Sequence, residues 1–219
     1  RLSRLGAELP EGFVGEVNLG LGPWMRQVSA GLDRGLVITI DYGYEACQLY
    51  SASRKRGTLH TYFRHAEGAG PYQRIGSQDI TAHVDFTAVA SEGARVGLRS
   101  AGLLTQAEYL KTLGWARMAE GVRGLTLSSY DRDANLMALR QLVSPEGLGG
   151  FKVMVQEKGM SIRGLGDLTP SLARTLATPV LSPEHAPLFA ARYPSQDPGL
   201  ETLWPFGAEQ SEEEGPGLR

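Results

Sequence analysis

The feature that most constrains this chain is an unbroken run of apolar and β-branched residues at 36–40, LVITI. A run without polar alternation is typical of a strand that is covered on both faces, as in a parallel sheet between layers of helices. The run leads directly into Asp41-Tyr42-Gly43-Tyr44. Ligands in open α/β sheets bind beyond the carboxyl ends of the strands. We therefore expect an α/β fold in which Asp41 and the three residues after it face a binding crevice.

Helical and strand patterns alternate along the first 159 residues. The expected helices cover residues 23–35, 86–92, 105–114 and 131–143, and the expected strands cover residues 13–17, 95–98 and 151–156. Asp85 is placed to cap the second of these helices, which Gly93 would close. Thr105 and Glu108 form a capping-box pattern at the start of the third. The last strand alternates in polarity, which predicts one wetter face.

Composition narrows the class of protein. The 219 residues are 42% hydrophobic and 21% charged, which is typical of a globular chain. The net charge of −2 gives no general attraction to nucleic acids or anionic membranes, and no apolar run approaches the roughly 20 residues of a membrane helix. The single cysteine, Cys47, excludes an intrachain disulfide and a Cys-rich metal site. We expect no nucleic-acid partner and no membrane partner.

The two ends of the chain carry further expectations. The chain opens at Arg1 without a methionine, so we expect its true start to lie upstream, and a cytoplasmic location, or a mitochondrial one in a eukaryote. Eight of the twelve prolines follow Gly159, and residues 193–217 hold six acidic side chains and no basic one. Such a composition favours disorder. We expect residues 1–159 to fold and residues 160–219 to form a Pro-rich, acidic, partly disordered tail.

A glycine pair, Gly20 and Gly22, permits a nucleotide-binding interpretation. Bare glycines let a phosphate approach a helix N-terminus, and Asp41, about 20 residues on, would bind a ribose. The third glycine of such loops is missing, and Pro23 and Trp24 place bulk where the ligand must approach. A strand-to-helix turn is the favoured interpretation.

Three histidines in the irregular segment 45–84 raise a second alternative. His60, His65, His83 and Asp85 permit a two-histidine, one-carboxylate iron site, as in metal-dependent oxygenases. The α/β sheet is not the usual host of such sites, and Asp85 already has a structural role as a helix cap. The metal site is therefore the weaker alternative.

The turn after the first strand is the third candidate site. A carboxylate at Asp41 can orient an amine or guanidinium group, and Tyr42 or Tyr44 can form the walls of a pocket. Gly43 lets a backbone come close because it has no side chain. A turn in which Asp41 accepts hydrogen bonds from nearby backbone amides explains the same residues equally well.

Taken in chain order, these segments resemble the second half of the MidA-type methyltransferases. The blocks that carry the resemblance are residues 9–12 (LPEG), 16–17, 34–35, 38–44, 57–59, His65, 79–86 (DITAHVDF), 102–103, 105–110, 113–114 and 151–154. They span about residues 8 to 159, and DYGY and TAHVDF, in this order and spacing, are their most specific part.

The resemblance implies a fold and a cofactor. MidA-type proteins are class I methyltransferases that use S-adenosylmethionine on a three-layer Rossmann-like sheet. They include a mitochondrial complex I assembly factor that methylates a protein arginine. This chain would supply the fifth, sixth and seventh strands, and the glycine-rich cofactor motif would lie upstream of Arg1, with no cofactor-binding residue in this segment. A partial sheet leaves strand edges open, so we expect the isolated chain to associate.

The resemblance also implies a reaction, which is methyl transfer to a protein side chain. Arginine is the expected acceptor, because the best-known member of the family methylates one. The expected catalytic residues are Asp41, His83 and Asp85, the expected substrate-binding residues are Tyr42, Gly43, Tyr44 and His65, and no metal is expected. A non-catalytic assembly or interaction module that keeps part of the fold is the alternative, because the glycine motif is missing from this chain.

Overall fold

The computed structural model describes residues 9–64, 66–68 and 70–162. Within these residues the chain divides into two compact units, one formed by residues 9–59 and 81–162 and the other by residues 60–64, 66–68 and 70–80. His65 and the expected tail from residue 163 onward lie outside the described residues.

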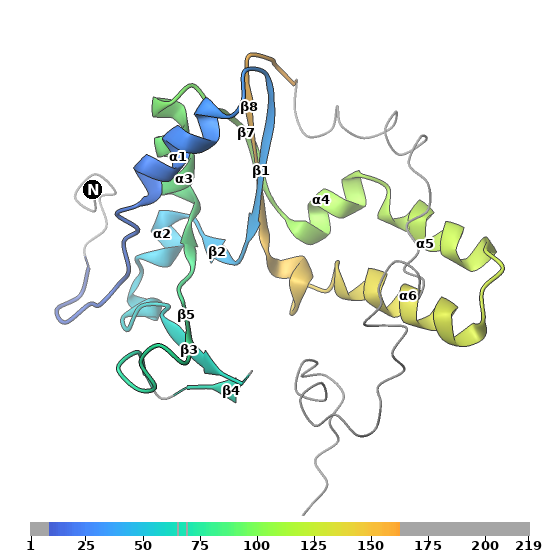
Figure 1. The fold of residues 1–219 in the computed structure, drawn as a ribbon, viewed down its shortest axis with the longest axis horizontal. Helices are drawn as coiled ribbons and strands as arrows, with labels where there is room; N and C mark the ends of the chain where they lie inside the picture. The colour runs from blue at the N-terminus through green and yellow to red at the C-terminus, as the bar shows by residue number, and fades with distance from the viewer. Residues whose placement is uncertain (1–8, 65, 69, 163–219) are drawn as a thin grey trace, which may run out of the picture. The chain divides into compact units, whose positions relative to one another are not determined.

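A three-stranded sheet forms the centre of the larger unit (Figure 1). Its strands are, in order, β1 (Gly35–Asp41), β8 (Lys152–Lys158) and β7 (Arg99–Thr105). Because β8 is antiparallel to both neighbours, β1 and β7 run in the same direction. Asp41 at the end of β1 and Thr105 at the end of β7 are both paired with Lys152. The predicted strand at 36–40 is confirmed, and the carboxyl ends of β1 and β7 meet at one end of the sheet.

Helices cover the two faces of this sheet. α1 (Leu21–Ala30) and α3 (Phe86–Arg95) pack on one face, in a core that includes Met154 of β8. α4 (Gln106–Thr112) packs on the other face, in a core that includes Val153. The layered α/β architecture expected from the sequence is present (Figure 1).

Two expectations about the strands are wrong. The strand at 151–156 has no wet face, because β8 is the central strand, and Gln156 and Glu157 are 0% and 1% exposed. β1 shows the reverse: Ile38 and Ile40 are 46% and 50% exposed, and the strand's described neighbour is antiparallel. The described helices leave this part of β1 open on one face.

The end of α3 also differs from the expectation. The helix continues past Gly93 to Arg95, because Gly93 provides the close approach of α3 to Gln156 and not a C-terminal stop. Gly97, with φ +84°, provides the left-handed residue after the helix. The strand expected at 95–98 therefore begins later, as β7.

Residues 9–20 form neither helix nor strand, so the strand expected at 13–17 is wrong. The segment is held by side-chain packing and not by the backbone hydrogen bonds of a sheet. Phe13 packs against a small core made by Tyr50 and α2 (Ala46–Leu49). The N-terminal segment is thereby attached to the chain that follows β1.

The helices after β7 agree better with the sequence. The capping box predicted at Thr105 and Glu108 is confirmed at the start of α4. The remaining helical elements are α5 (Trp115–Gly124), α6 (Ser129–Gln141), and the 3-10 turns η2 (Ala52–Arg54) and η3 (Leu148–Gly150). Among the helices in the described ranges, none is long and apolar enough to cross a membrane.

The smaller unit contains three short strands. These are β3 (His60–Phe63), β4 (Ala66–Glu67) and β5 (Asp79–Thr81), in the order β4–β3–β5. Nδ1 of His60 lies 2.9 Å from Oε1 of Glu67. The segment that the sequence marks as irregular therefore includes a small sheet.

Candidate functional site

The site forms where β1 ends. β2 (Gly43–Tyr44) pairs in parallel with β6 (Val84–Asp85), and the backbone N–H of Val84 donates to the carbonyl of Tyr42 at 3.0 Å. A Cβ on Gly43 would overlap the backbone of Val84, so only glycine allows this close approach. The pairing brings together the blocks DYGY and TAHVDF, which lie far apart in the sequence.

Aromatic rings enclose His83. Its ring centroid lies 5.4 Å from that of Tyr42 and 5.3 Å from that of Tyr44. Phe151, which precedes β8, packs edge-on against Tyr42 at 5.6 Å. The guanidinium carbon of Arg54 lies 3.8 Å from the centre of the Tyr44 ring. Stacked and edge-on rings restrict one another, so this cluster holds the imidazole of His83 in one place.

Asp41 directly precedes Tyr42, the first ring of this aromatic cluster. Its Oδ1 accepts a hydrogen bond from the backbone N–H of Tyr42 at 2.8 Å, and its side chain is half-buried. This bond is the one that the turn interpretation of Asp41 requires. It engages one carboxylate oxygen and leaves the residue at the carboxyl end of β1, where the substrate-orienting role also places it.

Asp85 has structural bonds to both carboxylate oxygens. Oδ1 accepts the backbone N–H of Ala88 at 2.9 Å, which confirms the predicted cap of α3. Oδ2 accepts a hydrogen bond from the hydroxyl of Tyr50 at 3.3 Å. The same hydroxyl lies 3.1 Å from the backbone carbonyl of Glu16. Asp85 therefore joins the start of α3 to Tyr50, and Tyr50 in turn contacts the backbone of Glu16.

A cavity of about 290 Å³ lies beside these side chains. It is lined by Glu16, Val17, Asn18, Leu21, Tyr50, Ala82, His83, Val84, Asp85, Ala88 and Val89. Among the described residues, this lining holds the carboxylates of Glu16 and Asp85 and no lysine or arginine. It therefore favours a ligand group that is cationic or rich in hydrogen-bond donors.

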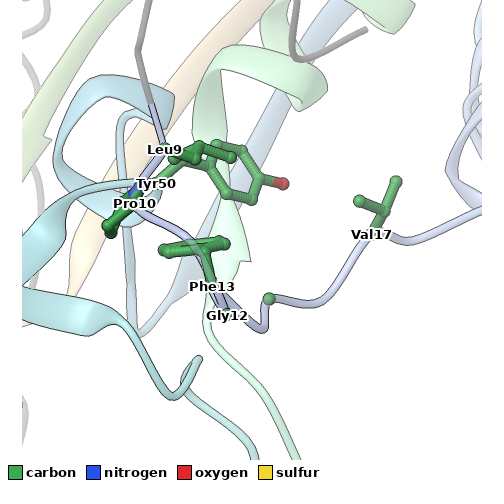
Figure 2. Close-up of a pocket in the computed structure, with 7 residues that line it drawn as sticks. Leu9, Pro10, Gly12, Phe13, Val17 and Tyr50 are labelled. Carbon is green, nitrogen blue, oxygen red and sulfur yellow. The ribbon is translucent and has the colours of Figure 1, made fainter.

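A second cavity, of about 340 Å³, is of a different kind. Figure 2 shows Tyr50 with Leu9, Pro10 and Phe13 around it and its hydroxyl pointing toward the side on which Val17 lies. Among the described residues that line it, the side chains are apolar except for that hydroxyl, and none is a carboxylate, histidine, lysine or cysteine. This cavity is a hollow over the small core of α2 and offers no catalytic group.

The glycine pair at the start of α1 does not have the geometry of a phosphate-binding loop. Gly20 and Gly22 begin α1, but the segment before them is not a strand, and the carboxylate of Glu92 lies against Gly22, where it disfavours an anion. The turn after β1 contains a single glycine, Gly43. The phosphate-loop alternative is not supported by this geometry.

The metal alternative also finds no support in the described part of the chain. No group of three histidine, cysteine, aspartate or glutamate side chains there is arranged to hold a metal ion. His60 pairs with Glu67 in the smaller unit, and His83 is enclosed by aromatic rings in the larger one.

Comparisons with known proteins now bear on this site. Residues 1–104 match a family described as "Putative S-adenosyl-L-methionine-dependent methyltransferase". The chain is similar to an uncharacterized COG1565 superfamily protein from Burkholderia thailandensis, with 31% identity and a TM-score of 0.65, over 77% of this chain and 45% of that one. No curated protein matches the chain.

A second structure from the same organism is a member of the same superfamily bound to S-adenosyl-homocysteine. It is 30% identical with a TM-score of 0.64, over 75% of this chain and 42% of that one. The resemblance to the MidA-type methyltransferase family is confirmed. This chain spans less than half the length of either MidA-type neighbour, and its β1–β8–β7 sheet is part of a Rossmann-like methyltransferase fold.

Two residues of the site were not singled out for it by the sequence. Glu16 binds Thr58, and Thr58 in turn binds the backbone of His83. These contacts join three segments that are remote in sequence, and no local sequence pattern predicts such contacts. Glu16 and Thr58 each fall in a block that resembles the MidA-type family, which was the one available signal.

Proposed function

We propose that this chain forms the acceptor side of an S-adenosylmethionine-dependent methyltransferase whose substrate is a protein arginine. The observation that carries the proposal is the enclosure of His83 by Tyr42 and Tyr44, directly after Asp41, in a chain that matches a methyltransferase family. The methyl donor would be held by a part of the protein that corresponds to the length of the neighbours that this chain does not span.

In methyl transfer to nitrogen, the protein itself forms no covalent bond to the reactants. The acceptor nitrogen must be held in line with the methyl group and shielded from water. Asp41 is proposed to accept hydrogen bonds from the acceptor, since a carboxylate and a guanidinium form paired, charge-assisted bonds. Tyr42, Gly43 and Tyr44 are proposed to form the wall against which the acceptor packs. His65 stays a predicted substrate contact outside the described residues.

His83 and Asp85 have different proposed parts. His83 is proposed to orient the acceptor or take its proton, because an imidazole accepts a proton near neutral pH. Asp85 shapes the cavity through its bonds to Ala88 and Tyr50, and its negative charge favours a cationic acceptor. Support for an arginine comes from the acidic lining of the cavity and from the best-known member of the family.

One observation favours a second function. The turns after β1 and before α1 lack a cofactor loop in the part of the chain that the structure describes. A protein with that deficiency throughout would be an assembly or interaction module that keeps the fold without catalysing methyl transfer.

The test uses the 219-residue chain and the product of the whole reading frame that encodes it. S-adenosylmethionine binding is measured by titration calorimetry, and methyl transfer is measured with tritiated donor on arginine-containing peptides and on a cell extract. We expect binding and transfer for the product of the whole reading frame, and no binding for the chain alone. Failure of both proteins to bind would overturn the enzyme proposal and favour the interaction module.

A further inference from the structure

A hydrogen-bonded relay runs from Glu16 to the backbone of His83. Oε2 of Glu16 accepts the backbone N–H of Thr58 at 2.9 Å and the hydroxyl of Thr58 at 3.0 Å. The hydroxyl oxygen of Thr58 accepts the backbone N–H of His83 at 3.0 Å. The hydroxyl of Thr58 thus donates to the carboxylate of Glu16 and accepts from the backbone of His83, whose ring belongs to the aromatic cluster.

The local structure is built around this relay. Thr58 is 5% exposed, so its hydrogen bonds are shielded from water. Gly57, with φ +74°, lies against the carboxylate of Glu16, which leaves no room for a Cβ. Bonds to an ionised group in such surroundings are stronger than neutral ones.

A second contact secures the same stretch of chain from its other side. The hydroxyl of Tyr50 lies 3.1 Å from the backbone carbonyl of Glu16 and 3.3 Å from Oδ2 of Asp85. The hydroxyl has one proton for these two acceptors, and it holds the backbone of Glu16 near the residue two positions after His83. Between these two contacts, the ring is placed against Tyr42 and Tyr44.

We propose that Glu16 is a positioning residue that acts through Thr58 to set the orientation of the His83 ring between Tyr42 and Tyr44. The consequence for turnover rests on the proposed methyltransferase function, whereas the effect on the ring does not. Glu16 touches no reacting group in this scheme. It fixes the backbone from which the imidazole projects, and a small displacement of that backbone misaligns the imidazole.

The test compares Thr58→Val with Thr58→Ser in the product of the whole reading frame. Valine keeps the shape of threonine but removes the oxygen that joins Glu16 to His83, and serine keeps that oxygen. The His83 ring protons are observed by NMR after selective histidine labelling, and they are identified by their loss in His83→Gln. Thr58→Val is expected to shift these signals away from their ring-current positions, and Thr58→Ser to restore them.

Turnover supplies the second readout. Thr58→Val is expected to lower kcat on the order of tenfold or more with little change in KM for the methyl donor, since a displaced group loses alignment rather than binding. Glu16→Ala repeats the test if Thr58→Val does not fold, because it removes the carboxylate oxygen that accepts both hydrogen bonds from Thr58. Glu11→Ala, an exposed change in the same segment, is the matched control.

The outcomes separate the two proposals. Unchanged His83 signals in folded Thr58→Val, or in folded Glu16→Ala if valine does not fold, would overturn the positioning role whatever the turnover. Shifted signals in a protein that shows no methyl transfer would support the positioning role and count against the proposed function. Shifted signals with a serine-rescued loss of kcat would support both.

Discussion

The hydroxyl of Tyr50 donates a hydrogen bond to Oδ2 of Asp85 at 3.3 Å, and this contact joins the core around α2 to the start of α3. Oδ1 of the same carboxylate caps the helix. Asp85, which the sequence predicts both as a helix cap and as a catalytic residue, therefore makes a structural hydrogen bond through each of its carboxylate oxygens.

Replacing Asp85 is expected to separate these two roles. Asp85→Ala removes the cap of α3 and should lower the free energy of unfolding by about 1 kcal/mol. Asp85→Asn keeps a capping oxygen and should lose much less. Chemical denaturation measures both. If Asp85→Asn is as stable as the wild type and equally active, the charge of Asp85 has no part in turnover.

Asp41→Asn is expected to abolish most of the methyl transfer and to leave the fold intact. The amide oxygen of asparagine can still accept the N–H of Tyr42, so the turn should persist. The lost negative charge should lower kcat/KM on the order of tenfold or more, as for a removed charge-assisted bond. Asp33→Asn, at an exposed position before β1, is the control. Unchanged turnover in Asp41→Asn would remove Asp41 from the mechanism.

Local signals in the sequence predicted local structure well. The capping box at Thr105 and the cap at Asp85 each depend on atoms within three residues, and both are present. The strand patterns failed where distant partners decide the outcome. The alternating polarity of 151–156 predicted one wetter face, but β8 lies between two strands and buries Gln156 and Glu157.

In the candidate site, too, contacts between remote segments could not be predicted from local sequence patterns. The family resemblance located Asp41 and His83, whereas the bonds from Glu16 to Thr58 depend on a tertiary contact between remote segments. The segment at 13–17 has strand-forming residues, but its side chains pack on Tyr50 and bind Thr58 instead of joining a sheet. Tertiary packing overrides local propensity at these positions.

Gly43→Ala is expected to be strongly destabilising. The added Cβ would overlap the backbone of Val84, which cannot move without breaking the pairing of β2 with β6. Overpacking of this kind costs about 1–3 kcal/mol. Gly124→Ala is the matched control, because nothing lies within 4 Å of its Cβ, and it should be neutral or stabilise by up to about 1 kcal/mol. The melting temperature of Gly43→Ala should therefore fall, whereas that of Gly124→Ala should stay unchanged or rise.

The capping box of α4 is expected to weaken in acid. Hydrogen bonds from the backbone and then the side chain of Thr105 lower the pKa of Glu108 from its ordinary value of 4.5. A lowered pKa means that the stabilisation is complete above the ordinary value and is lost as the pH falls through the lowered pKa. Because Glu108 is exposed, the effect should stay below about 1 kcal/mol. Denaturation across this acidic range should show the loss in the wild type, and Glu108→Gln should lack that component.

The open face of β1 is expected to make the 219-residue chain associate. Ile38 and Ile40 are 46% and 50% exposed, and β8 is the one strand paired with β1 in the described part of the chain. An unpaired apolar edge invites pairing with another copy, and lysine on such an edge opposes it. The double change Ile38→Lys and Ile40→Lys should therefore reduce association in sedimentation velocity. Val14→Lys, at a side chain that is 61% exposed outside the sheet, should not. A monodisperse wild-type chain that melts cooperatively would contradict this account of β1.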